Sequence, residues 1–155
     1  MAESVQAVIY QLIYRSLFDR TSGGPLTVVQ DILAHSERNN SRHRVTGFLL
    51  FDKTHFMQIL EGDRTDVEAI FAGIEKDPRH SEVTVLHEGM TERRAFPEWS
   101  MGGVVKSPEL AVLFTQYGWD ELACQLPSGA HLIALAQDVA QLEQDRARTR
   151  GLSPR

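Results

Sequence analysis

Hydrophobic and polar residues along the chain follow two spacings that predict its elements. Alternation in steps of two is typical of a β-strand, because successive side chains point to opposite faces. It predicts strands over residues 5–14, 45–51, 55–62, 82–87 and 99–105. Apolar residues three and four positions apart predict amphipathic helices. Two such helical faces are expected to be buried between the strands: Val29, Ile32, Leu33 and Ser36 on the first helix, and Val67, Ile70, Phe71 and Ile74 on the second.

Helix ends are indicated by capping patterns. Thr27 with Gln30, and Thr65 with Glu68, match the capping box and predict the starts of these two helices. Asp77 precedes a proline and predicts the end of the second. From Ser107 the pattern becomes helical, with a short helix ending before Gly118 and a longer one over about residues 128–146.

The predicted order is β-α-β-β-α-β-β followed by two helices, which indicates an α+β fold of the ferredoxin-like type. We expect one sheet with two helices on one face and the two-helix C-terminal extension on the other. The chain then divides into a main domain over residues 5–106, a helical extension over 107–147, and a tail over 148–155 that we expect to be disordered.

Composition narrows the class of protein. The 155 residues suit one domain, and the net charge of −5 argues against a nucleic-acid partner. One cysteine, Cys124, excludes an internal disulfide and fits a reducing compartment. The sequence contains no run of about 18 apolar residues, so no membrane span is predicted. The N-terminus does not resemble a signal peptide, and the histidines do not have the spacing of metal ligands. We therefore expect a cytoplasmic protein without a metal site.

One strand contains a polar residue where an apolar one is expected. In the stretch HFMQILEG, residues 55–62, Phe56, Gln58 and Leu60 share a face. An unpaired buried amide costs about 1–3 kcal/mol, so Gln58 requires a hydrogen-bond partner.

Two further polar residues are expected to face inward near Gln58. Tyr14 lies at the end of the first strand, which the topology places beside the third, and Asn40 continues the buried face of the first helix. A phenol and two amides around an apolar slot suit a flat heterocycle with polar edges. A hydrogen-bond network within the core explains the same pattern, so both interpretations stay open here.

Five motifs occur in order at matching intervals: LIYRS, SERNN with VTGFLLF, FMQILEGD, DPRH and EWSM. Together they resemble the BLUF family of blue-light sensors that use flavin. The resemblance covers about residues 7–105, and the remaining helices resemble the extension of the short, stand-alone members.

The resemblance implies a non-enzymatic photoreceptor that binds FAD, with FMN as the alternative flavin. Tyr14 matches the residue that donates an electron and a proton to the excited flavin. Gln58 matches the glutamine that bridges tyrosine and flavin, and its rearrangement shifts the flavin absorption to longer wavelength. The signal then reaches a protein partner, which the sequence does not identify, and homo-oligomerisation is compatible with this role.

The resemblance also implies roles for other residues in these motifs. The residues implied to bind the flavin, besides Tyr14 and Gln58, are Ile32, Asn39, Asn40, Ile74, Arg79 and His80. Trp99, Ser100 and Met101 match the strand associated with signal output. Gly73 departs from the pattern, since relatives often carry an Arg or His there.

Alternatives from other classes are a ferredoxin-like flavin oxidoreductase and a binding module that does not respond to light. Tyr10, on the same face as Tyr14, is interpreted as a core or rim residue. Glu61 and Asp63 are interpreted as parts of a turn that leads into the second helix, with no chemical role.

Overall fold

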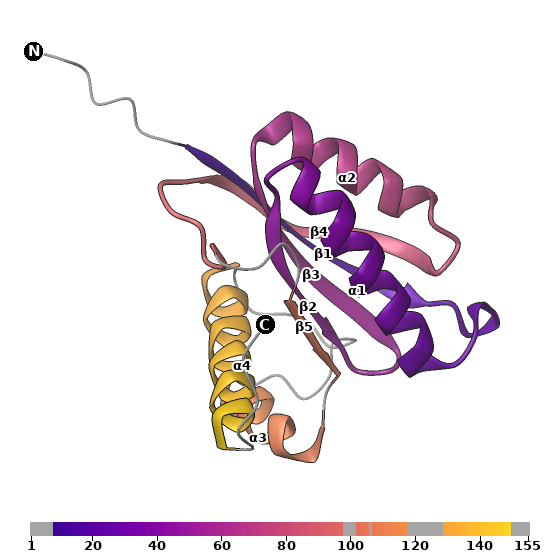
Figure 1. The fold of residues 1–155 in the computed structure, drawn as a ribbon, viewed down its shortest axis with the longest axis vertical. Helices are drawn as coiled ribbons and strands as arrows, with labels where there is room; N and C mark the ends of the chain where they lie inside the picture. The colour runs from indigo at the N-terminus through magenta and orange to yellow at the C-terminus, as the bar shows by residue number, and fades with distance from the viewer. Residues whose placement is uncertain (1–7, 98–101, 106, 118–128, 150–155) are drawn as a thin grey trace, which may run out of the picture.

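The computed structural model describes residues 8–97, 102–105, 107–117 and 129–149 (Figure 1). Its elements are β1 (Ile9–Phe18), η1 (Arg20–Ser22), α1 (Pro25–Arg42), β2 (Thr46–Phe51), β3 (His55–Gly62), α2 (Arg64–Lys76), β4 (His80–Thr91), β5 (Gly102–Val105), α3 (Pro108–Gln116) and α4 (Gly129–Thr149).

The strands form one sheet in the order β4-β1-β3-β2-β5. β1 runs antiparallel to both β3 and β4, β2 is antiparallel to β3, and β5 is parallel to β2. Each of α1 and α2 crosses over one intervening strand, which is the ferredoxin-like arrangement that the order of elements predicts. Figure 1 shows α1 and α2 on one side of the sheet and α3 and α4 on the other. The predicted α+β fold is confirmed.

Two hydrophobic cores flank the sheet, because its strands are apolar on both faces. On β3, Phe56 and Leu60 belong to the core beneath α1 and α2, whereas Met57 and Ile59 belong to the core beneath α3 and α4. The second core also contains Leu110 and Phe114 from α3 together with Leu132, Leu135, Ala136 and Val139 from α4. The C-terminal helices therefore complete the core of the same domain.

Two strands are longer than the alternation predicts. β1 ends at Phe18, four residues after the expected end at Tyr14, because it pairs with β3 as far as Leu17. The sequence does not predict this extension because Arg15 and Ser16 are polar and interrupt the apolar pattern, although Ser16 is fully buried in the structure. β4 runs from His80 to Thr91 along the edge of the sheet, beyond the expected 82–87.

Both predicted capping boxes are wrong. α1 begins at Pro25, and its N-cap residue Gly24 makes no side-chain hydrogen bond. Proline suits this first position because the backbone N–H that it lacks would have no partner within the helix. α2 begins after Asp63, whose Oδ1 accepts a hydrogen bond of 3.0 Å from the Thr65 amide. The predicted helix start at Ser107 is confirmed, because Ser107 is the N-cap of α3 and its Oγ accepts a hydrogen bond from the Leu110 amide at 3.4 Å.

Candidate functional site

A cavity opens between α1 and α2 beside the sheet. The residues that line it are Ile32, His35, Ser36, Asn39 and Asn40 from α1, Gln58 from β3, Ile70, Gly73 and Ile74 from α2, Asp77 and Arg79 from the turn after α2, and His80 from the start of β4. All the predicted flavin-binding residues except Tyr14 line this cavity. The structure thus brings together positions that lie up to 48 residues apart in the chain.

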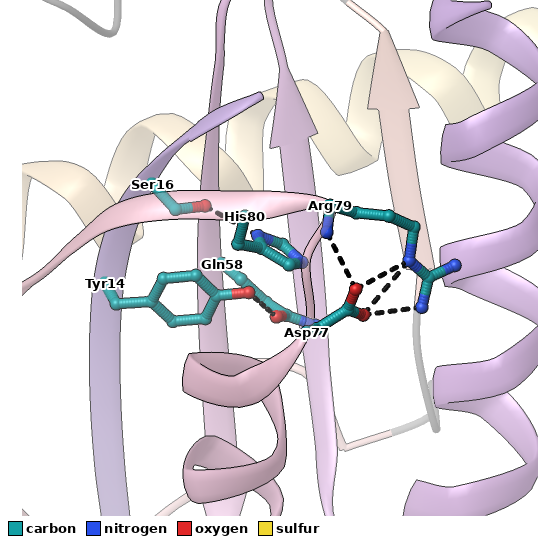
Figure 2. A network of polar contacts seen from close by, with 6 residues as sticks. All are labelled: Tyr14, Ser16, Gln58, Asp77, Arg79 and His80. Carbon is teal, nitrogen blue, oxygen red and sulfur yellow. Dashed lines mark hydrogen bonds and ion pairs between the residues drawn. The ribbon is translucent and has the colours of Figure 1, made fainter. Parts of the chain in front are cut away.

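Tyr14 does not line the cavity itself but is hydrogen-bonded to Gln58, which does. The two residues are directly opposite each other on β1 and β3, and the Tyr14 hydroxyl donates a hydrogen bond to Gln58 Oε1 (Figure 2). Both side chains are at most 1% exposed. Tyr14 is therefore a hydrogen-bond partner for the amide in the apolar face of β3.

The environment of Tyr14 keeps its phenol protonated. Burial raises the pKa of Tyr14 well above its usual range, and the negative charge of Asp77 adds to this effect. The ring of Phe71 lies 5.4 Å from the tyrosine ring, measured between centroids. A buried neutral phenol beside an amide can lose a proton readily only if its ring is oxidised first.

Asn40 lies at the last turn of α1 and is fully buried. Its backbone carbonyl accepts hydrogen bonds from the amides of His43 and Val45, at 3.1 and 3.0 Å, which hold the helix end against β2. The side chain has contacts of its own, but among the described residues no donor lies at its buried Oδ1 atom. Asn39, one residue earlier, is half-buried at the cavity wall.

His80 connects the cavity to β1. Its Nδ1 lies 2.7 Å from the hydroxyl of the buried Ser16, and its ring packs at 6.1 Å from Tyr14 and 4.7 Å from Phe56, centroid to centroid. Burial lowers the pKa of His80 to about 4, although Asp77 acts in the opposite direction. The imidazole is therefore neutral at physiological pH and presents one donor and one acceptor.

An ion pair lies next to His80 at the cavity wall. Arg79 Nη2 is 2.6 Å from Asp77 Oδ2, and Arg79 Nε and its backbone amide also donate to this carboxylate (Figure 2). Burial pushes the pKa of Asp77 upward, but the hydrogen bonds and charge of Arg79 outweigh it and hold the pKa below its usual value. The pair fixes the orientation of the guanidinium at the site.

These residues fit a flat aromatic cofactor with a polar edge. Ile32 on α1 and Ile74 on α2 supply aliphatic walls, whereas Asn40 and Gln58 supply amide donors and acceptors at the inner end. A tyrosine lies in hydrogen-bond contact with one of those amides. Phenols are redox-active, so the site places a group that is able to give up an electron and a proton beside a space that suits a heterocycle.

A family model described as sensors of blue-light using FAD matches residues 9–102. The match covers more than half of the 155 residues. The chain belongs to the BLUF family. The cofactor of this family is FAD, and its members sense blue light.

Solved BLUF structures share the fold. The dark-state structure of the BLUF protein BlrB has a TM-score of 0.75 and 30% identity, over 86% of this chain and 98% of that one. The photo-activated state of BlsA has a TM-score of 0.76 and 25% identity, over 84% of this chain and 93% of that one. Both comparisons extend past the matched BLUF region and therefore include C-terminal elements.

Two curated relatives are much longer than this chain. The blue light- and temperature-regulated antirepressor BluF of Escherichia coli is 37% identical over 75 residues, which are 48% of this chain and 18% of the antirepressor. The photoactivated adenylate cyclase subunit alpha of Euglena gracilis is 28% identical over 119 residues, which are 74% of this chain and 12% of the cyclase. The similarity therefore concerns a small part of each relative.

The remaining predicted residues have different outcomes. Trp99, Ser100 and Met101 lie outside the described residues, so their role in output stays a prediction. At Gly73 an added Cβ would meet no atom within 4 Å, so the α2 wall has open space at that position.

Within the described ranges no helix is both long and apolar enough to span a bilayer, and no group of three potential metal-ligating side chains occurs.

The interpretation of Glu61 as part of a turn is wrong. Its side chain is fully buried within β3 and accepts hydrogen bonds from Gln11 and from the backbone at 95 and 96. Ser16, the partner of His80, was also missed. Alternation along β3 does place Glu61 on the same face as Met57 and Ile59, and that inward position is the signal that could have revealed it.

Proposed function

We propose that this protein is a blue-light photoreceptor in which Tyr14 and Gln58 convert light absorption by FAD into a rearranged hydrogen-bond network. The observation that carries the proposal is the buried hydrogen bond from Tyr14 to Gln58 at the wall of a cavity with aliphatic and amide lining. Membership of the BLUF family supports it.

The residues that would hold the cofactor are those of the cavity. Ile32 and Ile74 would flank the ring, because they face it from the two helices. Asn39, Asn40 and Gln58 would hydrogen-bond its polar edge. Arg79, in the turn after α2, and His80, at the start of β4, would also contact it. When bound, FAD supplies the absorption of blue light and the oxidising excited state.

Tyr14 is the proposed donor of an electron and of its hydroxyl proton. Oxidation of the ring lowers the affinity of Oη for its proton, which then leaves along the hydrogen bond toward Gln58. When electron and proton return, the phenol is neutral again, but the Gln58 amide can remain rotated or in its imidic tautomer. The amide then presents a different group to the cavity, so we expect the absorption to shift to longer wavelength.

The signal must leave the cavity to reach a partner. We propose a light-regulated protein partner, in line with the names of two relatives, a light-regulated antirepressor and a photoactivated cyclase subunit. Trp99, Ser100 and Met101 are the proposed output residues, and residues 107–147 are the proposed output extension of a sensor that spans 5–106.

The test is the absorption spectrum of the purified protein with FAD, before, during and after blue light. We expect a shift of the flavin bands to longer wavelength that reverses in the dark, with the flavin still oxidised. Lasting bleaching would indicate flavin reduction and favour an oxidoreductase. Bound FAD with an unchanged spectrum would indicate a binding module that does not respond to light. Either result would overturn the proposal.

A further inference from the structure

Glu61 is a buried charged side chain that the proposed photochemistry does not use. It is 0% exposed and lies three residues after Gln58 on β3. Its side chain is on the opposite face of the sheet from Gln58, in the layer that α3 and α4 cover. A carboxyl group in such a position requires several hydrogen bonds.

Both oxygens of Glu61 accept hydrogen bonds from one segment of chain after β4. The amide of Ala95 donates to Oε2 at 2.7 Å and the amide of Phe96 donates to Oε1 at 2.8 Å. Gln11 Nε2 also donates to Oε2, at 2.9 Å. Every contact is an N–H donor to a carboxyl oxygen, which an ionised carboxylate satisfies and a primary amide does not.

The neighbouring strands strengthen this attachment. Gln11 on β1 and Thr46 on β2 are the cross-strand partners of Glu61, so the three residues form a row across the sheet. Arg94 Nη1 donates to Thr46 Oγ1 at 2.9 Å and to the Glu61 carbonyl at 3.0 Å. The segment 94–96 is therefore bound at several points to the part of β3 that follows Gln58.

The same segment contacts the C-terminal helices. The Phe96 ring stacks on Phe48 at 5.3 Å between centroids and belongs to the core beneath α3 and α4. Gln137 of α4 donates to the Ala95 carbonyl at 3.4 Å. A surface pocket of about 240 Å³ lies between residues 95–97 and α4, so side chains of α4 line the same space as this segment.

We propose that Glu61 is the positioning residue that couples the rearrangement of Gln58 to segment 94–96 and, through it, to α4. The inference rests on the proposed function, because it needs a light-driven change at Gln58. Met57 and Ile59 make apolar contacts on the same face, and these tolerate small displacements of β3. The hydrogen bonds of Glu61 are directional and charge-assisted, so a displacement of β3 weakens them and releases segment 94–96.

Hydrogen exchange of individual amides tests the coupling, since the Ala95 and Phe96 N–H groups bind Glu61 directly. In the full chain loaded with FAD, we expect faster exchange at 95 and 96, and changed exchange in α4, under blue light than in darkness. Glu61→Gln should keep the red shift, exchange rapidly at 95 and 96 in both conditions, and lose the light-dependent change in α4. A purely structural role for Glu61 would leave that change in α4 intact.

Glu88→Gln is the matched control. It makes the same change of carboxylate to amide on β4, where Glu88 accepts a hydrogen bond from Tyr10. The amides of Ala95 and Phe96 donate to Glu61 instead. We expect it to retain both the red shift and the light-dependent exchange in α4.

Hydrogen exchange of the wild-type protein tests the coupling even if Glu61→Gln fails to fold. A wild-type red shift with unchanged exchange at 95, 96 and α4 overturns the coupling and leaves the proposed function standing. A Glu61→Gln protein that responds like wild type in α4 also overturns the coupling. A wild-type protein without a red shift overturns the proposed function, and the coupling with it.

Discussion

At the scale of single residues, Tyr14 and Tyr10 provide a direct comparison. Both are buried on the same face of β1, but Tyr14 donates to Gln58, whereas Tyr10 donates to Glu88 at 2.8 Å. Burial, then the hydrogen bond to Glu88, raise the pKa of Tyr10 to about 12, so both phenols are neutral at physiological pH. They differ in their proximity to the cavity.

We expect Tyr14→Phe to retain FAD and to lose the red shift, because the ring remains and the hydroxyl that supplies the proton is absent. Tyr10→Phe should show both FAD binding and a normal red shift. The measurement is the light-minus-dark absorption difference of each variant at equal flavin occupancy. A normal response in Tyr14→Phe, or its loss in Tyr10→Phe, would refute the assignment of Tyr14.

His80 makes the stability of the protein depend on pH. Its pKa falls from 6.5 to about 4 on folding, so the folded state resists protonation. Above pH 6.5 the imidazole is neutral in both states, so His80 does not lower the free energy of unfolding there. As the pH falls toward 4, the unfolded chain binds a proton that the folded protein does not, so the free energy of unfolding decreases. The decrease is at most roughly 3.5 kcal/mol, at about 1.4 kcal/mol per pH unit.

The check is urea unfolding without FAD at several pH values between 7 and 4. In His80→Gln the amide can still bond to Ser16 but does not titrate, so we expect the loss of stability over this range to be smaller. An equal loss in the variant and the wild type would show that His80 is not the cause. Below pH 4 His80 should contribute no further change.

The residue positions at the site were largely predictable because strand and helix periods are strict. Alternation from Phe56 places Gln58 inward, and the helix period places Asn40 inward. Glu61 and Ser16 were missed because a charged or hydroxyl residue near a strand end looks like the start of a loop. Their partners, in segment 94–96 and at His80, are distant in the sequence, so no local pattern reveals them.

At the scale of elements, β5 packs closely against its neighbours. A Cβ added at Gly103 would lie 2.7 Å from Leu33 Cδ2 and 3.1 Å from the Leu49 carbonyl oxygen. β5 is parallel to β2, and Gly103 is paired with Leu49. The absence of a side chain at this position therefore allows β5 to lie under α1.

We expect Gly103→Ala to destabilise the fold by about 1–3 kcal/mol, since the new methyl overpacks this contact. Gly73→Ala is the matched control, because its Cβ meets nothing within 4 Å and alanine favours a helix over glycine by about 1 kcal/mol. Thermal unfolding without added FAD measures both changes. Equal melting temperatures for the two variants would contradict the packing described for β5.

Element order was predictable, whereas some element ends, those of α1 and β1 among them, were not. The first turn of α1 begins with Pro25, so a proline and not the threonine of a capping box marks its start. The length of β1 depends on pairing with β3, which is a long-range interaction. Local signals therefore identify the elements, and a long-range contact determines where β1 ends.

At the scale of the whole molecule, the sheet has a core on each face. Ile13, Phe48, Leu50, Met57 and Ile59 are nearly inaccessible to solvent because residues of α3 and α4 cover them. Burial of one such side chain contributes about 1.5–3 kcal/mol, and a domain is stable by only about 5–15 kcal/mol. The division into a sensor and an output extension is thus a proposal about signalling, and the two parts share a core.

We expect truncation after Lys106 to prevent stable monomeric folding, because it exposes this apolar face. The truncated chain should aggregate, self-associate or melt well below the full chain, as size-exclusion chromatography and thermal unfolding would show. A stable, monomeric truncated protein with the melting temperature of the full chain would show that α3 and α4 contribute little to the core.

The central claim is that the pair formed by Tyr14 and Gln58 converts blue light into a reversible change around FAD. The most direct test is the light-minus-dark visible difference spectrum of the wild type beside Gln58→Leu, at equal FAD occupancy. The account predicts a reversible red shift in the wild type and none in Gln58→Leu, which keeps the apolar wall but lacks the amide. A red shift of equal size in Gln58→Leu would contradict it.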